Sequence, residues 1–200
     1  MPNNKELKQI AKYIYECGIL NKTPRSGLWF LGTGKQSVAE HVLRTTLIGL
    51  ALSHLVPKAN KYKIIMMCLT HDLGEGRTSD LNYVHQKYGS TAEMRALKDI
   101  ADSIPFGKEV ANLFNEFEDR KTLEAKLTRD ADQLEWIATL RDEQTKGNVK
   151  ALSWAKLAYK RLKTPVGKKI AKMLFATHPD DWWYRKDDKW FVHRRGGGRK

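Results

Sequence analysis

The chain has 200 residues, 41% of them hydrophobic and 30% charged, so it can bury a core in one domain and is neither disordered nor fibrous. No apolar run approaches the ~20 residues that span a bilayer, and the two cysteines lie far apart, so we predict a cytoplasmic protein with no membrane partner. The net charge of +13 favours phosphorylated substrates and permits, without requiring, a nucleic-acid partner.

Hydrophobic residues recur with helical spacing through most of the chain, which predicts an all-α domain over residues 1–178. The breaker-rich residues 21–36 predict an ordered loop. Ser37 and Glu40, at the start of the helix that follows, have the form of a capping box. Helices are predicted near residues 5–17, 37–55, 61–73, 91–103, 107–119, 122–146, 149–162 and 166–175.

The remaining residues, 179–200, form a short appendix of a different character. Trp182, Trp183 and Trp190 flank basic residues, a pattern that fits a hairpin. A flap over the core is favoured over a stacking platform for bases. The glycine-rich end at 196–200 is expected to be frayed.

The end of the most apolar predicted helix carries a concentration of polar side chains. Its sequence is Thr70-His71-Asp72-Leu73-Gly74-Glu75-Gly76. A carboxylate beside a buried helix is costly to desolvate unless it is paired or bound to a metal, and His71 with Asp72 offers two good ligand types. Two further acids, Glu75 and Asp80, follow within a glycine-containing turn. A solvated helix end explains the same pair, so the segment alone is a weak indication of a metal site.

A second candidate ligand is His41. It shares a helical face with Thr45 and Leu52, so its side chain is expected to point inward. An isolated histidine on an apolar face is more often a core residue than a ligand. Glu40 and Arg44 nearby indicate a more polar surrounding, and both interpretations stay open.

The third candidate lies in the helix predicted at 122–146, which offers two aspartates two positions apart. The main apolar stripe of this helix contains Leu123, Leu127 and Leu134. Asp130 lies near that stripe, whereas Asp132 lies on the opposite side. Periodicity therefore mildly favours Asp130 as the inward-facing acid and does not decide between the two.

Four motifs occur in a fixed order along the chain. They are Thr23-Pro24-Arg25-Ser26-Gly27, then Ser37-Val38-Ala39-Glu40-His41, then His71-Asp72-Leu73-Gly74-Glu75 with Asp80, then Glu124-Ala125-Lys126 ahead of Asp132-Gln133-Leu134-Glu135. This order resembles that of the HD-domain metal phosphohydrolases, in particular the branch that contains the 5′-deoxynucleotidases. The resemblance covers about residues 5–147 and implies an HD-domain helical bundle.

The resemblance also implies a metal site. His41, His71, Asp72 and Asp132 would bind one divalent transition metal, and the match selects Asp132 over Asp130. A set of imidazoles and carboxylates suits Mn, Co, Fe, Ni or Zn better than Ca. A homodimer is a further expectation from the family.

The same match assigns roles around the metal. Glu75 corresponds to the family's acid–base carboxylate, and Asp80 to a second acid close to the reacting group. Arg25 corresponds to a phosphate-binding arginine, whose planar fork suits phosphate oxygens. Trp29 is the candidate for the aromatic residue that packs on the sugar. It lies further from Arg25 than in the family, which leaves the choice between deoxyribose and ribose open.

The expected activity is that of a 5′-nucleotidase, which hydrolyses (deoxy)nucleoside monophosphates to nucleoside and orthophosphate. One alternative is a deoxynucleoside triphosphate triphosphohydrolase, which the many Lys and Arg side chains would suit. Another is a nucleic-acid-binding module on a vestigial HD scaffold, which would use residues 182–200. The presence of all four ligands and both acids argues against the loss of activity.

Overall fold

A computed structural model describes residues 2–89 and 92–184 of the chain. Within these ranges the fold is helical, and the one extended pairing is an isolated bridge between Pro24 and Ser37. No helix in the described ranges is long and apolar enough to cross a membrane. The elements are α1 (Asn4–Cys17), η1 (Gly18–Asn21), α2 (Gly27–Leu31), α3 (Val38–Leu55), α4 (Lys61–Thr70), α5 (Glu75–Thr78), α6 (Tyr83–Tyr88), α7 (Glu93–Ser103), α8 (Gly107–Asp119), α9 (Leu123–Thr145), α10 (Ala151–Arg161) and α11 (Pro165–Ala176).

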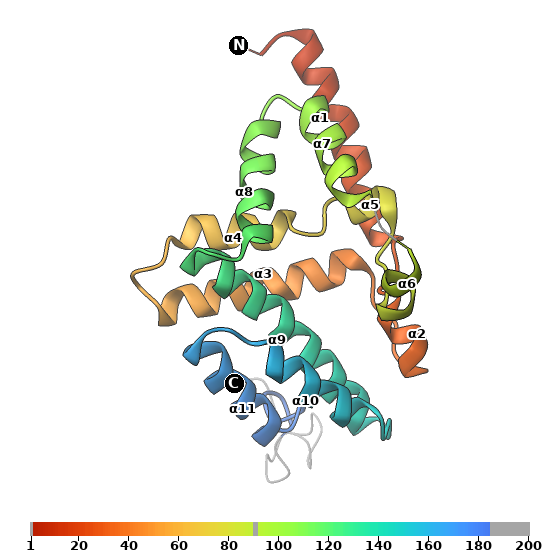
Figure 1. Ribbon diagram of the computed structural model, residues 1–200, viewed down its shortest axis with the longest axis vertical. Helices are drawn as coiled ribbons and strands as arrows, with labels where there is room; N and C mark the ends of the chain where they lie inside the picture. The colour runs from red at the N-terminus through yellow and green to blue at the C-terminus, as the bar shows by residue number, and fades with distance from the viewer. Residues whose placement is uncertain (1, 90–91, 185–200) are drawn as a thin grey trace, which may run out of the picture.

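Three helices, α3, α4 and α9, form the centre of the fold. Helix α9 packs against α3 and α4 on one side and against α10 and α11 on another. Figure 1 shows α3 and α4 side by side, with α7 and α8 toward one end of the molecule and α10 and α11 toward the other. The largest cluster of buried side chains joins these central helices, and it includes Leu52, Ile64, Leu134 and Ile137. The apolar faces of α3, α4 and α9 therefore fix how the polar ends of these helices meet.

The contact between α3 and α4 depends on a glycine. A Cβ atom added at Gly49 would lie 2.7 Å from Sγ of Cys68 and 3.2 Å from Cγ2 of Ile64. Both of these α4 side chains are fully buried. The close approach of the two helices therefore requires the absence of a side chain at residue 49.

The back of α9 is held by a buried carboxylate. Asp130 is fully buried, and its two oxygens accept hydrogen bonds from the backbone N–H groups of Lys163 (2.7 Å) and Thr164 (2.8 Å). The Thr164 hydroxyl donates a third bond of 2.6 Å and also caps α11 by accepting from Gly167 N–H. Asp130 thus fastens the α10–α11 connection to the central helix.

The helical pattern predicted from the sequence is confirmed, with local differences. The capping box of Ser37 and Glu40 is present, and both cysteines are free thiols. The helix expected at 61–73 ends at Thr70, because residues 71–74 turn toward α5. The expected loop at 21–36 contains the short helix α2, which ends at Gly32 with φ of +86°. The predicted hairpin and frayed end fall mostly on residues 185–200, outside the described ranges.

Candidate metal centre and active site

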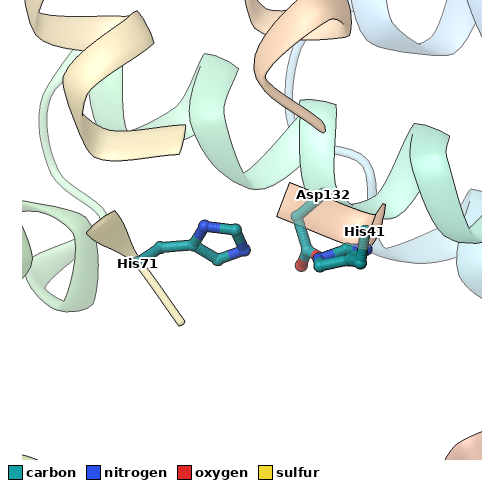
Figure 2. A group of neighbouring side chains, drawn as sticks. All are labelled: His41, His71 and Asp132. Atoms are coloured by element: carbon teal, nitrogen blue, oxygen red, sulfur yellow. The ribbon is translucent and has the colours of Figure 1, made fainter. Parts of the chain in front are cut away.

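Three candidate ligands from three different helices meet at one point. His41 lies on α3, His71 caps the C-terminus of α4, and Asp132 lies on α9. Their ligand atoms lie within 4.8 Å of one another, and Figure 2 shows His71 directed toward the neighbouring His41 and Asp132 side chains. Both imidazoles are buried, whereas the Asp132 side chain is 15% exposed. The cluster is therefore enclosed by protein and open on its carboxylate side.

Asp72 lies against both histidines. Its Oδ2 atom is 3.4 Å from Nε2 of His41 and 3.3 Å from Nε2 of His71. Atoms that bind one transition metal at about 2.1 Å are about 3 Å apart, so these separations suit ligands of a common ion. Two imidazoles with two carboxylates also form a donor set that suits a divalent transition metal.

The ring nitrogens of both histidines are oriented for metal binding. Nδ1 of His71 donates to the carbonyl oxygen of Cys68 at 2.9 Å, and Nδ1 of His41 is 2.7 Å from Oε2 of Glu135. Because carbonyl and carboxylate oxygens only accept, each Nδ1 carries a proton, and each Nε2 atom faces the cluster. Nε2 of His71 is buried and has no hydrogen-bond partner. This unpartnered nitrogen is the observation that best supports a bound ion.

Glu135 belongs to the fourth sequence motif, but its role could not be read from the sequence. It is fully buried on α9, and it accepts hydrogen bonds from Gln36 (2.6 Å), Arg44 (2.9 Å) and Thr139 (3.0 Å) in addition to its bond with His41. Burial raises its pKa, but the hydrogen bond and charge of His41 and the charge of Arg44 outweigh this effect and lower the pKa to about 2. Glu135 is therefore an ionised acceptor that holds the imidazole of His41 in place.

A pocket of about 280 Å³ opens beside the cluster. It brings together the candidate ligands His71, Asp72 and Asp132 with the predicted residues Arg25, Glu75 and Asp80. Further side chains complete its wall. They include Tyr83, Glu93, Phe117, Arg129, Gln133, Trp136 and Arg161. Carboxylates, arginines and aromatic rings thus share one pocket, the combination expected for a phosphorylated ligand that carries a ring.

Glu75 begins α5 at the edge of this pocket, and its Oε2 atom is buried and unpartnered. Burial raises its pKa to about 10, with further contributions from the negative charges of Asp72 and Asp80 and opposition from Arg25. A carboxyl group with a raised pKa keeps its proton at neutral pH, which is what a general acid needs.

Arg25 and Asp80 form an anchored pair. Nη1 of Arg25 donates to Oδ2 of Asp72 at 3.3 Å, and its Nε lies 3.9 Å from Oδ2 of Asp80. The same Asp80 oxygen accepts from the Ser26 N–H at 2.7 Å, and the Ser26 hydroxyl donates to the Asp80 carbonyl. Asp80 therefore holds the start of α2 and steadies the guanidinium beside the metal cluster.

Trp29 lies away from this pocket. Its side chain is 60% exposed, meets His85 edge to face, and lines a second hollow, which shares Arg25 with the main pocket. The aromatic residues of the main pocket are instead Tyr83, Phe117 and Trp136. Trp136 follows Asp132 by one helical turn, so the spacing from the predicted ligand contained a signal that could have identified it.

Asp130 and Asp132 lie in different surroundings. Asp132 joins the histidines, with Oδ1 3.4 Å from Nε2 of His41, whereas Asp130 is the buried anchor of the α10–α11 connection. Periodicity correctly placed Asp130 inside the protein, but its surroundings are structural and contain no metal ligand.

The bundle and this cluster define an HD-type metal phosphohydrolase. A family model described as HD domain matches residues 17–174, and the chain belongs to this family. A Dictyostelium discoideum protein named 5′-deoxynucleotidase HDDC2 is 33% identical over 133 residues, which are 60% of this chain and 70% of that protein. The curated relatives thus include named enzymes, and the chain is an enzyme of the metal-dependent phosphohydrolase class.

Two solved structures extend the comparison. A conserved hypothetical protein from Pyrococcus furiosus is 29% identical with a TM-score of 0.75, and the match covers 84% of this chain and 99% of that one. The HD phosphohydrolase DatZ of cyanophage S-2L, described as bound to dA and one catalytic Zn²⁺ ion, is 21% identical with a TM-score of 0.52, over 82% of this chain and 96% of that one. At this identity the second likeness concerns the fold alone.

Proposed function

We propose that the chain is a 5′-nucleotidase that hydrolyses deoxynucleoside 5′-monophosphates to nucleoside and orthophosphate. The observation that carries the proposal is the single pocket in which the histidine and aspartate cluster, Arg25 and Glu75 meet three aromatic rings. The relatives named 5′-deoxynucleotidase support it.

Each group has a chemical task in this proposal. His41, His71, Asp72 and Asp132 would hold one divalent transition metal, which when bound would polarise the phosphoryl oxygens and activate water. Arg25, already oriented by Asp80, stabilises the negative charge of the phosphoryl group in the transition state. Glu75 donates the proton that the leaving O5′ atom of the sugar requires.

The proposal is tested with metal-stripped protein that is reloaded with Mn, Co, Fe, Ni or Zn. Deoxy- and ribonucleoside mono- and triphosphates are supplied, and orthophosphate and tripolyphosphate are both quantified. We expect orthophosphate from deoxynucleoside monophosphates and its loss in Asp72→Ala. If no product forms with any of these metals and nucleotides, the proposal is refuted.

Glu75→Gln tests the acid separately. We expect turnover to fall about 10²- to 10⁴-fold, because an amide cannot transfer a proton to the leaving oxygen. Metal content, measured by elemental analysis, should stay at the wild-type level because Glu75 is not among the proposed ligands. Near-normal turnover with metal bound would assign the acid role to another group.

A second candidate reaction is the release of tripolyphosphate from deoxynucleoside triphosphates. Two arginines besides Arg25, Arg129 and Arg161, line the same pocket and favour additional phosphate groups. Each is engaged, however: Arg129 pairs with Glu118 at 2.5 Å, and Arg161 hydrogen-bonds the Tyr83 hydroxyl. Their existing partners make the monophosphate reaction the better supported of the two, and the assay above separates the products.

We also propose that the protein is a homodimer and that it is located in the cytoplasm, as expected from the sequence. Sedimentation of the full chain tests the first, and localisation of the protein in cells tests the second.

A further inference from the structure

Unpartnered polar atoms gather in the main pocket. Among the described residues, five side chains hold a buried polar atom with no hydrogen-bond partner, and four of the five line this pocket. The four atoms are Nε2 of His71, Oε2 of Glu75, Nε of Arg129 and Oε1 of Gln133. Buried polar groups are normally paired, so such a concentration marks where a ligand supplies the missing partners. The proposed metal and leaving group account for His71 and Glu75, whereas the donor on Arg129 and the acceptor on Gln133 have no assigned partner.

The orientation of the Gln133 amide is fixed by its neighbour. Nε2 of Gln133 donates to Oδ2 of Asp132 at 2.9 Å. Because the carboxylate of Asp132 only accepts, the amide nitrogen must face it and Oε1 must face elsewhere. Gln133 therefore presents a hydrogen-bond acceptor, and the missing partner is a donor.

The position of Gln133 along α9 indicates which part of a nucleotide it faces. Asp132, in the proposed metal cluster, directly precedes Gln133. Trp136 lines the same pocket and lies about 6 Å beyond Asp132 along the helix axis. A Cβ atom on Gly27 would be 3.6 Å from the Trp136 ring, so this ring closes the pocket against the α2 segment that follows Arg25. In a nucleoside 5′-monophosphate the sugar lies between phosphate and base. Along the axis of α9, Gln133 follows Asp132 and precedes Trp136, an order that matches phosphate, sugar and base.

We infer that Gln133 is a substrate-binding residue whose Oε1 accepts a hydrogen bond from the 3′-hydroxyl of the deoxyribose. This inference rests on the proposed function, and it deepens that function by assigning the sugar contact. Once the 5′ oxygen is esterified, a deoxynucleotide has only one sugar hydroxyl left, and that group is a donor common to all four bases. The contact thus recognises the sugar without selecting a base.

The test compares deoxyadenosine 5′-monophosphate with its 2′,3′-dideoxy analogue, which lacks the 3′-hydroxyl. For the wild-type protein we expect kcat/KM to be about tenfold higher for the deoxy substrate, the value of one neutral hydrogen bond with a buried acceptor. Gln133→Met keeps the length of the side chain without the acceptor and should reduce this ratio to about twofold or less.

The substrate ratio separates sugar binding from damage to the metal site. Loss of the Gln133 contact to Asp132 slows both substrates equally, because both use the same metal, so it leaves the ratio unchanged. Gln144→Met makes the same exchange further along α9, outside the pocket, and should keep the wild-type ratio. Metal content is measured for every variant.

Several outcomes would overturn the inference. The sugar contact is refuted if the wild-type protein has equal kcat/KM for the deoxy and dideoxy substrates, or if Gln133→Met keeps the wild-type preference. Neither result affects the proposed nucleotidase activity. A third comparison uses deoxyadenosine 5′-monophosphate and the analogue whose base lacks the 6-amino group. If the wild-type protein prefers the adenine substrate and Gln133→Met abolishes that preference, Oε1 contacts the base and the assignment to the sugar is wrong. If the wild-type protein hydrolyses neither monophosphate with any metal, the proposed function fails first and the inference fails with it.

Discussion

Asp130 and Asp132 lie two residues apart on α9 but serve two different regions of the molecule. Behind the helix, Asp130 is fully buried and accepts three hydrogen bonds from the α10–α11 connection. In front of it, Asp132 lines a pocket in which several buried polar atoms have no protein partner. A region that satisfies every polar group is built for stability, whereas a region that leaves them unsatisfied is built for a ligand.

The largest expected effect is on the pocket side. Asp132→Ala should lower phosphatase turnover by at least about 10³-fold, because loss of a direct ligand exceeds the roughly 10- to 100-fold cost of losing an outer partner. Orthophosphate release and bound metal are measured together. The free energy of unfolding of the metal-stripped protein should change less than it does in Asp130→Ala. If the Asp132→Ala variant binds the full amount of metal and has normal turnover, Asp132 is not a ligand.

The matching change behind the helix should act on stability. Asp130→Ala leaves two backbone N–H groups and the Thr164 hydroxyl without their acceptor, so we expect a loss of about 3 kcal/mol in the free energy of unfolding. Urea unfolding of the metal-stripped protein measures this loss. Turnover per folded molecule should stay near the wild-type value. A large drop in turnover with unchanged stability would reverse the assignment of the two aspartates.

The contact between Glu135 and His41 can be tested by a third substitution on α9. Glu135→Gln is nearly isosteric but weakens the bond that orients His41, so the metal dissociation constant should rise about 10- to 100-fold. Competition with a chromophoric chelator measures this constant. Asp142→Asn is the control, because Asp142 contacts the same Arg44 but not His41. Equal effects of the two substitutions would show that the network acts on folding and not on the imidazole.

The smallest effect concerns the pH dependence of stability. Burial, then Asp72 and Glu118, raise the pKa of Glu93 to about 7, against the opposing charge of Arg129. The folded state therefore holds this proton more tightly than the unfolded state between pH 4.5 and 7, and stability falls as pH rises through that window. After allowance for solvent screening of this partly exposed group, Glu93→Gln should stabilise the metal-stripped protein by about 1 kcal/mol at pH 8 relative to pH 5. Chemical unfolding at the two pH values measures this difference, and an equal effect at both would show that Glu93 titrates normally.

The sequence predicted the long helices because their apolar periodicity and capping residues are local signals. Ser37 with Glu40 marked the start of α3 correctly. Short elements such as α2 and α5 were not predicted, because four or five residues carry too little periodicity to identify a helix. The end of α4 at Thr70 was also missed, since the turn that follows depends on tertiary contacts of residues 71–74.

The candidate site was predictable only in part. Motif order indicated the residues that the structure brings together, but periodicity reports burial without its cause, so it favoured Asp130, which is buried by the α10–α11 connection. Glu135 was missed because its partners Gln36, His41 and Arg44 are more than ninety positions away in sequence. Such contacts form only when the helices pack.

The close approach at Gly49 bears on the spacing of the two histidines. Cys68, the residue that excludes a side chain at position 49, also accepts the hydrogen bond that orients His71, while His41 lies two turns before Gly49 on the opposing helix. The spacing between the two imidazoles is thus set by a nonpolar contact within the core. A side chain at position 49 would therefore move the two imidazoles relative to each other without altering either histidine.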